Sequence, residues 1–118
     1  MIGIDIVSIP RIEKMINKFG NRALKKFLNE SEISLIKSPQ TAAGFWAAKE
    51  ALSKALGCGI GSELSFHDIN ISKTSKGKPI VSLPKEKYKY FNIEKIDISI
   101  THEKEFAIAA AIVLRNHF

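Results

Sequence analysis

The hydrophobic period of the chain changes at about Phe66, and this change constrains the fold more than any other feature of the sequence. Before Phe66 the apolar side chains recur at helical spacing, whereas after it they alternate along short segments. Helices in the first half of a chain and strands in the second are typical of the α+β class. We therefore expect an antiparallel sheet packed against helices.

Local signals set the bounds of the expected elements. Residues 2–7 alternate in the manner of a strand, which has to join the sheet from the far end of the sequence. Ser8 and Pro10 predict the cap and the first turn of a helix that Gly20 ends. Further helices are expected over residues 22–37, 41–56 and 84–90, and paired strands over 67–73 with 78–83 and over 95–101 with 106–114.

The length and composition of the chain indicate one globular unit. Its 118 residues, 45% hydrophobic and 25% charged, suit a single domain over residues 1–118 with a core of its own. Cys58 is the only cysteine, which excludes an internal disulfide and a cysteine-based zinc site. Residues 1–10 do not have the pattern expected of a signal peptide, and the sequence has no apolar run of about 18 residues. We therefore expect a cytoplasmic protein without a membrane partner.

The formal net charge of +6 predicts an anionic partner. Nucleic acid, a phosphorylated small molecule and an acidic protein all fit this charge, which alone does not choose among them. A basic nucleic-acid-binding module without catalysis is therefore an alternative function. The aromatic residues do not form an RNA-stacking motif, however, and we expect no nucleic-acid partner.

The segment 45–56 carries charges where a packing helix is expected. On a helical wheel Lys49 falls inside the apolar stripe, whereas Glu50 and Lys54 fall roughly opposite it. Three structural interpretations stand beside any functional one. Lys49 can bury its stem and keep its ammonium in water, Glu50 and Lys54 can form an i,i+4 pair, and Gly57 can simply end the helix.

Asp5 interrupts a run of β-branched residues near the expected centre of the sheet, where aspartate is disfavoured. A half-buried carboxylate needs a cation, a set of hydrogen bonds or a metal as its partner. A structural salt bridge is one solution. The other is that Asp5 and Glu50 together hold Mg²⁺, which proteins often bind through one or two carboxylates and substrate phosphates. Lysines beside such a site would neutralise the remaining phosphate oxygens. Spacing alone does not establish that the strand and the helix meet.

Five segments follow one another over nearly the whole chain: GIDIVSIPRIE, FWAAKEALSKALGCGIG, LSFHDINI, GKPIV and ISITHEKEFAIAAAIV. In this order they resemble the holo-[acyl-carrier-protein] synthases, which are 4′-phosphopantetheinyl transferases. The resemblance implies the fold and the reaction of that family. In the reaction a serine of apo acyl carrier protein attacks the phosphorus attached to the pantetheine arm of coenzyme A, and adenosine 3′,5′-bisphosphate leaves.

The resemblance also implies three catalytic residues. Asp5 and Glu50 match the metal ligands of the family, so Mg²⁺ held by them would bind the pyrophosphate of coenzyme A. Glu50 also matches the acid that helps to deprotonate the serine, which is a general-base step. Lys54 resembles the lysine that approaches the pyrophosphate.

Contacts to coenzyme A are implied for Lys49, Lys54, Gly57, Lys76, Lys78 and His102. Lys49 would lie beside a phosphate, with a purely structural role as the alternative. Lys76 and Lys78 flank a turn glycine and would reach the 3′-phosphate unless they are solvated turn lysines. The chain departs from the family at Phe45, where many members carry arginine, and at Cys58, where threonine is common.

The resemblance finally implies two kinds of protein partner. Arg11 matches a basic residue that the family presents to the acidic acyl carrier protein. Arg22 and Lys25 would extend this basic patch unless they form an ordinary solvated helix face. Members of the family are typically homotrimers with each active site between protomers, so we expect the same assembly here.

Overall fold

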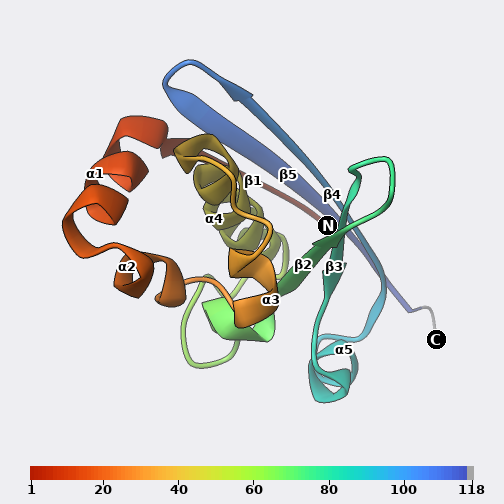
Figure 1. Ribbon diagram of the computed structural model, residues 1–118. Coiled ribbons are helices and arrows are strands. Elements are labelled where there is room, and N and C mark those ends of the chain that lie inside the picture. The colour runs from red at the N-terminus through yellow and green to blue at the C-terminus, as the bar shows by residue number, and fades with distance from the viewer. Residues whose placement is uncertain (117–118) are drawn as a thin grey trace.

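A three-stranded antiparallel sheet carries one long helix on one of its faces in the computed structural model, which describes residues 1–116 (Figure 1). The helix is α4 (Pro39–Ala55) and the strands are β1 (Ile2–Ser8), β4 (Ile93–Glu103) and β5 (Phe106–Arg115). Their order is β1-β5-β4, so the first strand joins the last one, as the sequence predicted. The α+β class with an antiparallel sheet is confirmed.

The remaining elements surround this helix and sheet. Helices α1 and α2 lie to one side of α4, while a separate two-stranded antiparallel sheet lies next to β4 (Figure 1). None of the helices within the described residues is long and apolar enough to span a membrane. The bounds are α1 (Ile9–Phe19), α2 (Asn21–Lys25), α3 (Glu30–Ile33), the 3₁₀ helix η1 (Phe66–Asp68), β2 (Asn70–Lys73), β3 (Pro79–Ser82) and α5 (Lys85–Tyr90).

The expectation of one continuous helix over residues 22–37 is wrong. The chain forms the two short helices α2 and α3, which are separated at Asn29. The backbone N–H of Asn29 donates to Oε1 of Glu32 over 2.7 Å, which is half of a capping box and starts a new helix. This break turns the Glu32 side chain into the interior, where it is fully buried.

Gly3 allows β1 to lie directly against α4. A Cβ atom at this position would overlap the Ala51 carbonyl oxygen and lie 2.5 Å from the Ala55 nitrogen. Both obstacles are helix backbone, which cannot rotate away as a side chain can. The missing side chain of Gly3 therefore sets how close Asp5, two positions later on the same face of the strand, lies to the helix.

We expect Gly3→Ala to lower the free energy of unfolding by about 1–3 kcal/mol, because overpacking has to push the strand away from the helix. Urea unfolding followed by circular dichroism measures this change. Gly61→Ala is the matched control, since a Cβ atom there meets nothing within 4 Å. Equal stability of the two variants would show that the close approach of β1 to α4 is not required.

On β1 and β5, the face of the sheet that points away from α4 is apolar and exposed. The alternation in β1 turns Ile2, Ile4 and Ile6 outward with 74%, 62% and 58% of their surfaces exposed, while Gly3 and Val7 face the helix. Strand β5 repeats this arrangement with small residues buried under the helix and large ones outside. The outward side chains on β5 include Ile108, Ile112 and Leu114.

Candidate active site

Asp5 and Lys54 meet where β1 crosses the last turns of α4. The Lys54 ammonium donates to Oδ1 of Asp5 over 2.7 Å. Asp5 lies on an edge strand of the sheet rather than near its centre, and its side chain is 12% exposed against 55% for Lys54. The salt bridge foreseen for Asp5 is thus formed. Within residues 1–116 this is the only ion pair of Lys54. The i,i+4 ion pair between Glu50 and Lys54 is therefore not formed.

Glu50 completes an acid pair with Asp5. Burial raises the pKa of Glu50, and the negative charge of Asp5 raises it further, while the Lys54 ammonium opposes the change. The two carboxylates therefore lie near enough to repel each other. The pKa of Lys54 is raised in turn, chiefly by its hydrogen bond to Asp5 and by the charge of that carboxylate.

The donor set at this point suits a hard divalent cation. No three acidic, histidine or cysteine side chains cluster around a metal position anywhere in the described part of the chain. Asp5 and Glu50 supply two carboxylates, and Mg²⁺ is commonly bound by one or two carboxylates with its remaining positions left to water and substrate oxygens. Asp5 and Glu50 therefore fit Mg²⁺ as a pair of carboxylate ligands.

The acid pair opens onto the exposed apolar face of the sheet. A cavity of about 300 Å³ beside it is lined by Asp5 and Lys54 together with Ile4, Ile6 and Ile108. Those isoleucines belong to the outward face of β1 and β5. Anything that covers this apolar face would therefore also form a wall of the acid site.

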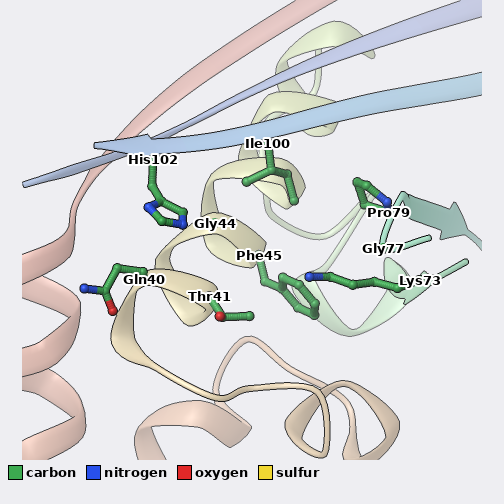
Figure 2. Close-up of a pocket in the computed structure, with 9 residues that line it drawn as sticks. All are labelled: Gln40, Thr41, Gly44, Phe45, Lys73, Gly77, Pro79, Ile100 and His102. Carbon is green, nitrogen blue, oxygen red and sulfur yellow. The ribbon is translucent and has the colours of Figure 1, made fainter. Parts of the chain in front are cut away.

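A second cavity, of about 190 Å³, lies at the opposite end of α4 (Figure 2). Figure 2 shows His102 hanging from β4 toward the first turns of α4, and Lys73 of β2 reaching the Phe45 ring. The Lys73 ammonium lies 5.8 Å from the centre of that ring, as in a cation–π contact. Gln40, Thr41, Gly44, Gly77, Pro79 and Ile100 complete the lining.

His102 is thus the one predicted coenzyme contact whose side chain lines this cavity. Lys78 instead pairs with Asp97 over 3.0 Å and lowers the pKa of that carboxyl by this contact. Lys76 is exposed on the same turn and does not line the cavity. The sequence analysis did not predict that Lys73 lines this cavity. The available signal was its position at the end of an expected strand, next to a turn that carries Lys76 and Lys78.

The coenzyme contact expected for Lys49 is contradicted by its burial. The side chain is 0% exposed, and its ammonium donates to Oε1 of Glu32 over 2.7 Å and to the carbonyl oxygens of Phe27 and Phe66. All three of its protons are used. Burial lowers the pKa of Lys49, and the Glu32 carboxylate opposes this. Lys49 has no proton left for a phosphate, and its ammonium does not reach water as one interpretation expected.

Glu32 completes the buried pair and is fully hydrogen-bonded itself. Its second oxygen accepts from the backbone N–H of Ile71 over 2.8 Å. The Glu32–Lys49 pair therefore connects α3, α4, η1 and β2. The helical wheel predicts the inward direction of Lys49 but not its partner Glu32, which lies 17 positions earlier in the chain.

Gly57 ends α4, as the structural interpretation expected. Its φ of 80° lies in the left-handed region, and its backbone N–H donates to the Lys54 carbonyl oxygen over 3.0 Å. The neighbouring Cys58 is partly buried, which raises the pKa of its thiol. Neither residue contacts Asp5 or Glu50 through a side chain.

The predicted basic patch is exposed on α1 and α2. Arg11, Arg22 and Lys25 all face solvent. The structure adds an aromatic centre to this patch, because Phe19 is 39% exposed and Arg22 lies 6.0 Å from its ring. Two further cations, Lys18 and Lys26, lie within 6 Å of the same ring.

The chain matches known proteins over nearly its whole length. A family model described as the 4′-phosphopantetheinyl transferase superfamily covers residues 1–111. A curated relative from Nautilia profundicola is 66% identical over 115 residues, which cover 98% of this chain and all of the relative. A second relative, from Aliarcobacter butzleri, is 57% identical and covers 95% of both chains. Both carry the name holo-[acyl-carrier-protein] synthase.

Solved structures agree with this match. The Helicobacter pylori holo-[acyl-carrier-protein] synthase in complex with coenzyme A is 54% identical and has a TM-score of 0.94, with 97% of this chain and all of that one covered. A Bacillus anthracis holo-(acyl-carrier-protein) synthase in complex with CoA (3′,5′-ADP) is 40% identical and has a TM-score of 0.82, with 98% of this chain and 96% of that one covered. The chain therefore belongs to the holo-[acyl-carrier-protein] synthase family of 4′-phosphopantetheinyl transferases, and it is an enzyme.

Proposed function

We propose that this enzyme transfers the 4′-phosphopantetheine group of coenzyme A to a serine of apo acyl carrier protein, in a Mg²⁺-dependent reaction that releases adenosine 3′,5′-bisphosphate. The observation that carries the proposal is the ion pair of Asp5 and Lys54, with Glu50 close enough for its charge to interact with both, in a fold shared with a coenzyme A-bound relative. Two acids and one exposed lysine are a suitable set for phosphoryl transfer, which requires mainly positioning and positive charge.

Each of these side chains has a separate task in the proposed reaction. Asp5 and Glu50 would hold Mg²⁺, which would supply positive charge to the diphosphate oxygens in the transition state. Lys54 donates a hydrogen bond to the bridging oxygen of the diphosphate. The bond between this oxygen and the transferred phosphorus breaks, and the oxygen leaves with adenosine 3′,5′-bisphosphate. Glu50 accepts the proton of the attacking serine, whose oxygen forms the new phosphoester bond.

The second cavity is proposed to bind the nucleotide half of coenzyme A. Phe45 and Lys54 are nine positions apart on α4, which corresponds to about 14 Å along the axis. An elongated ligand spans such a distance with its diphosphate at the acid pair and its adenosine end near His102. Lys73 and His102 would then face the 3′-phosphate, with Lys76 and Gly57 as further contacts at the two ends.

The basic patch is proposed to bind the acyl carrier protein. Arg11, Arg22 and Lys25 attract an acidic surface, and the exposed ring of Phe19 offers an apolar contact inside the ring of cations. Electrostatic attraction of this kind mainly raises the association rate. The wild-type KM for the carrier is accordingly expected to rise with salt concentration.

The apolar outer face of the sheet supports a homotrimer with each active site between protomers. Ile2, Ile4, Ile6 and Ile112 are large, exposed and contiguous with the cavity at Asp5. An apolar face of this kind marks an interaction surface. A neighbouring copy that covers it would also enclose the acid site.

We expect Ile112→Lys to dissociate the trimer into monomers and to lower the transfer activity with it, because the lysine charge would be buried at the interface. Size-exclusion chromatography with light scattering measures the mass in solution. Ile80→Lys is the matched control, since Ile80 is 42% exposed but lies on β3, outside this face. A trimer that survives Ile112→Lys, or a monomeric wild-type protein, would contradict the proposed assembly.

The transfer itself is tested by incubating the enzyme with apo acyl carrier protein, coenzyme A and Mg²⁺ and measuring the mass of the carrier. The carrier is expected to gain the mass of one phosphopantetheine arm, and only when both coenzyme A and a divalent cation are present. The same requirement separates this function from nucleic-acid binding. An unchanged carrier mass, under conditions in which a known transferase is active, would overturn the proposal.

A further inference from the structure

In the absence of a metal ion, the Lys54 ammonium neutralises the charge of the Asp5 carboxylate. This ammonium lies 2.7 Å from Oδ1 of Asp5, and in the described chain Lys54 is the only side chain that donates to this carboxylate. The positive charge of Lys54 also opposes the rise of the Glu50 pKa, so it acts on both acids. The Lys54 side chain is nevertheless 55% exposed, so its stem is free to move.

A divalent cation and the Lys54 ammonium compete for the same place. Mg²⁺ binds carboxylate oxygens at about 2.0–2.1 Å. If it bound Oδ1 of Asp5 while Lys54 kept its 2.7 Å contact, the two cations would lie within about 5 Å of each other. Repulsion at that distance disfavours simultaneous contact with one carboxylate oxygen.

We propose that Lys54 exchanges partners during the reaction: it neutralises Asp5 until a divalent cation binds to Asp5 and Glu50, and its ammonium then moves to the diphosphate of the substrate. This inference rests on the proposed function and specifies its order of binding: the divalent cation binds to the acids before Lys54 contacts the substrate. The cation that binds the acids frees the lysine that binds the substrate, so one lysine links the two binding events. The alternative is that Lys54 stays on Asp5 and shares it with the cation.

The exchange is tested by following the Lys54 side chain directly. In ¹H–¹³C spectra of protein with ¹³C-labelled lysine, the Lys54 Cε signal is assigned from its absence in Lys54→Gln. Asp5→Asn supplies the reference position of a Lys54 that has lost its carboxylate. Saturating the wild-type enzyme with Mg²⁺ alone is expected to move the signal toward this reference. A signal that keeps its metal-free position at saturation would overturn the exchange.

Affinity for the metal gives a second measurement that does not depend on turnover. Mn²⁺ binding, followed by electron paramagnetic resonance of the free ion, is expected to be about tenfold tighter in Lys54→Gln, because no ammonium has to be displaced. Lys78→Gln is the matched control, since Lys78 is also 55% exposed and also paired with an aspartate. Unchanged or weaker binding by Lys54→Gln would overturn the proposal.

The outcomes separate this inference from the proposed function. Failure of transfer in the carrier mass assay, with the Lys54 signal still moving on Mg²⁺ binding, would remove the function and leave the exchange in place. Normal transfer with an immobile Lys54 signal at saturating Mg²⁺ would remove the exchange alone. A wild-type enzyme that binds neither Mg²⁺ nor Mn²⁺ would overturn the exchange whatever the transfer assay shows.

Discussion

Replacing Glu50 by glutamine is expected to lower kcat/KM for phosphopantetheine transfer by about 10²–10⁴-fold, the usual contribution of a general base. Glutamine keeps the shape of the side chain but accepts no proton from the serine and contributes no negative charge to a metal site. Mass spectrometry of the carrier over time measures the rate. The loss is expected in kcat more than in KM for coenzyme A, because the proton transfer belongs to the transition state.

The same variant is expected to remain folded. Burial and the Asp5 charge raise the pKa of Glu50, which means that the folded protein disfavours the charged form. A neutral glutamine removes this penalty, so the melting temperature should equal or exceed that of the wild type. Glu86→Gln is the control for loss of an acid, since Glu86 is exposed on α5 and far along the chain from β1 and α4. A Glu50→Gln rate within tenfold of the wild-type rate would contradict the assignment.

The sequence predicted the types of most elements because their signals are local. Ser8 caps α1 as expected by accepting from the backbone N–H of Arg11 over 3.3 Å, and the strand pairs β2 with β3 and β4 with β5 both form. The helix break at Asn29 was missed although its signal is local too. A capping residue with a glutamate three positions later indicates a helix start, even inside a stretch of helix formers.

Contacts between distant residues were predicted only where one residue was out of place. Asp5 in a strand required a partner and has one in Lys54, whereas Lys49 was expected to reach water or a phosphate and pairs with Glu32 instead. The identity of each partner depends on the path of the chain in space, so neither Lys54 for Asp5 nor Glu32 for Lys49 follows from spacing. Lys73 occupies an ordinary exposed strand position, so no residue out of place indicated that it lines the second cavity.

The choice of which face of β1 is buried illustrates a second limit of prediction from sequence. Alternation in residues 2–7 predicts a strand with two different faces, and the isoleucines are the natural choice for the buried face. The structure buries the Gly3 face instead and leaves the isoleucines outside. Close packing against α4 needs the small residue, while the large apolar ones remain free for another molecule. The pattern within one chain contains no information about that molecule.

The two lysines of α4 should respond oppositely to the same substitution. Lys49→Met is expected to lower the free energy of unfolding by about 3–5 kcal/mol, because it leaves the buried Glu32 carboxylate without its cation. Lys54→Met should lower stability by less than Lys49→Met does, since the Lys54 side chain is 55% exposed and its ion pair is only partly buried. Its transfer activity should fall steeply, whereas folded Lys49→Met should keep the wild-type KM for coenzyme A. Urea unfolding and steady-state kinetics at low temperature measure both quantities.

A double variant separates the buried pair from a general packing defect at Lys49. Adding Glu32→Gln to Lys49→Met removes the unpaired charge, while the amide oxygen still accepts from the backbone N–H groups of Asn29 or Ile71. The double variant should therefore be more stable than Lys49→Met alone, which is the sign expected for coupled residues. Additive losses would contradict a charge-based origin, and a raised KM for coenzyme A in both variants would restore Lys49 as a substrate contact. The expected result makes Glu32–Lys49 a structural support of α4 and leaves Lys54 as the lysine of this helix that acts on the substrate.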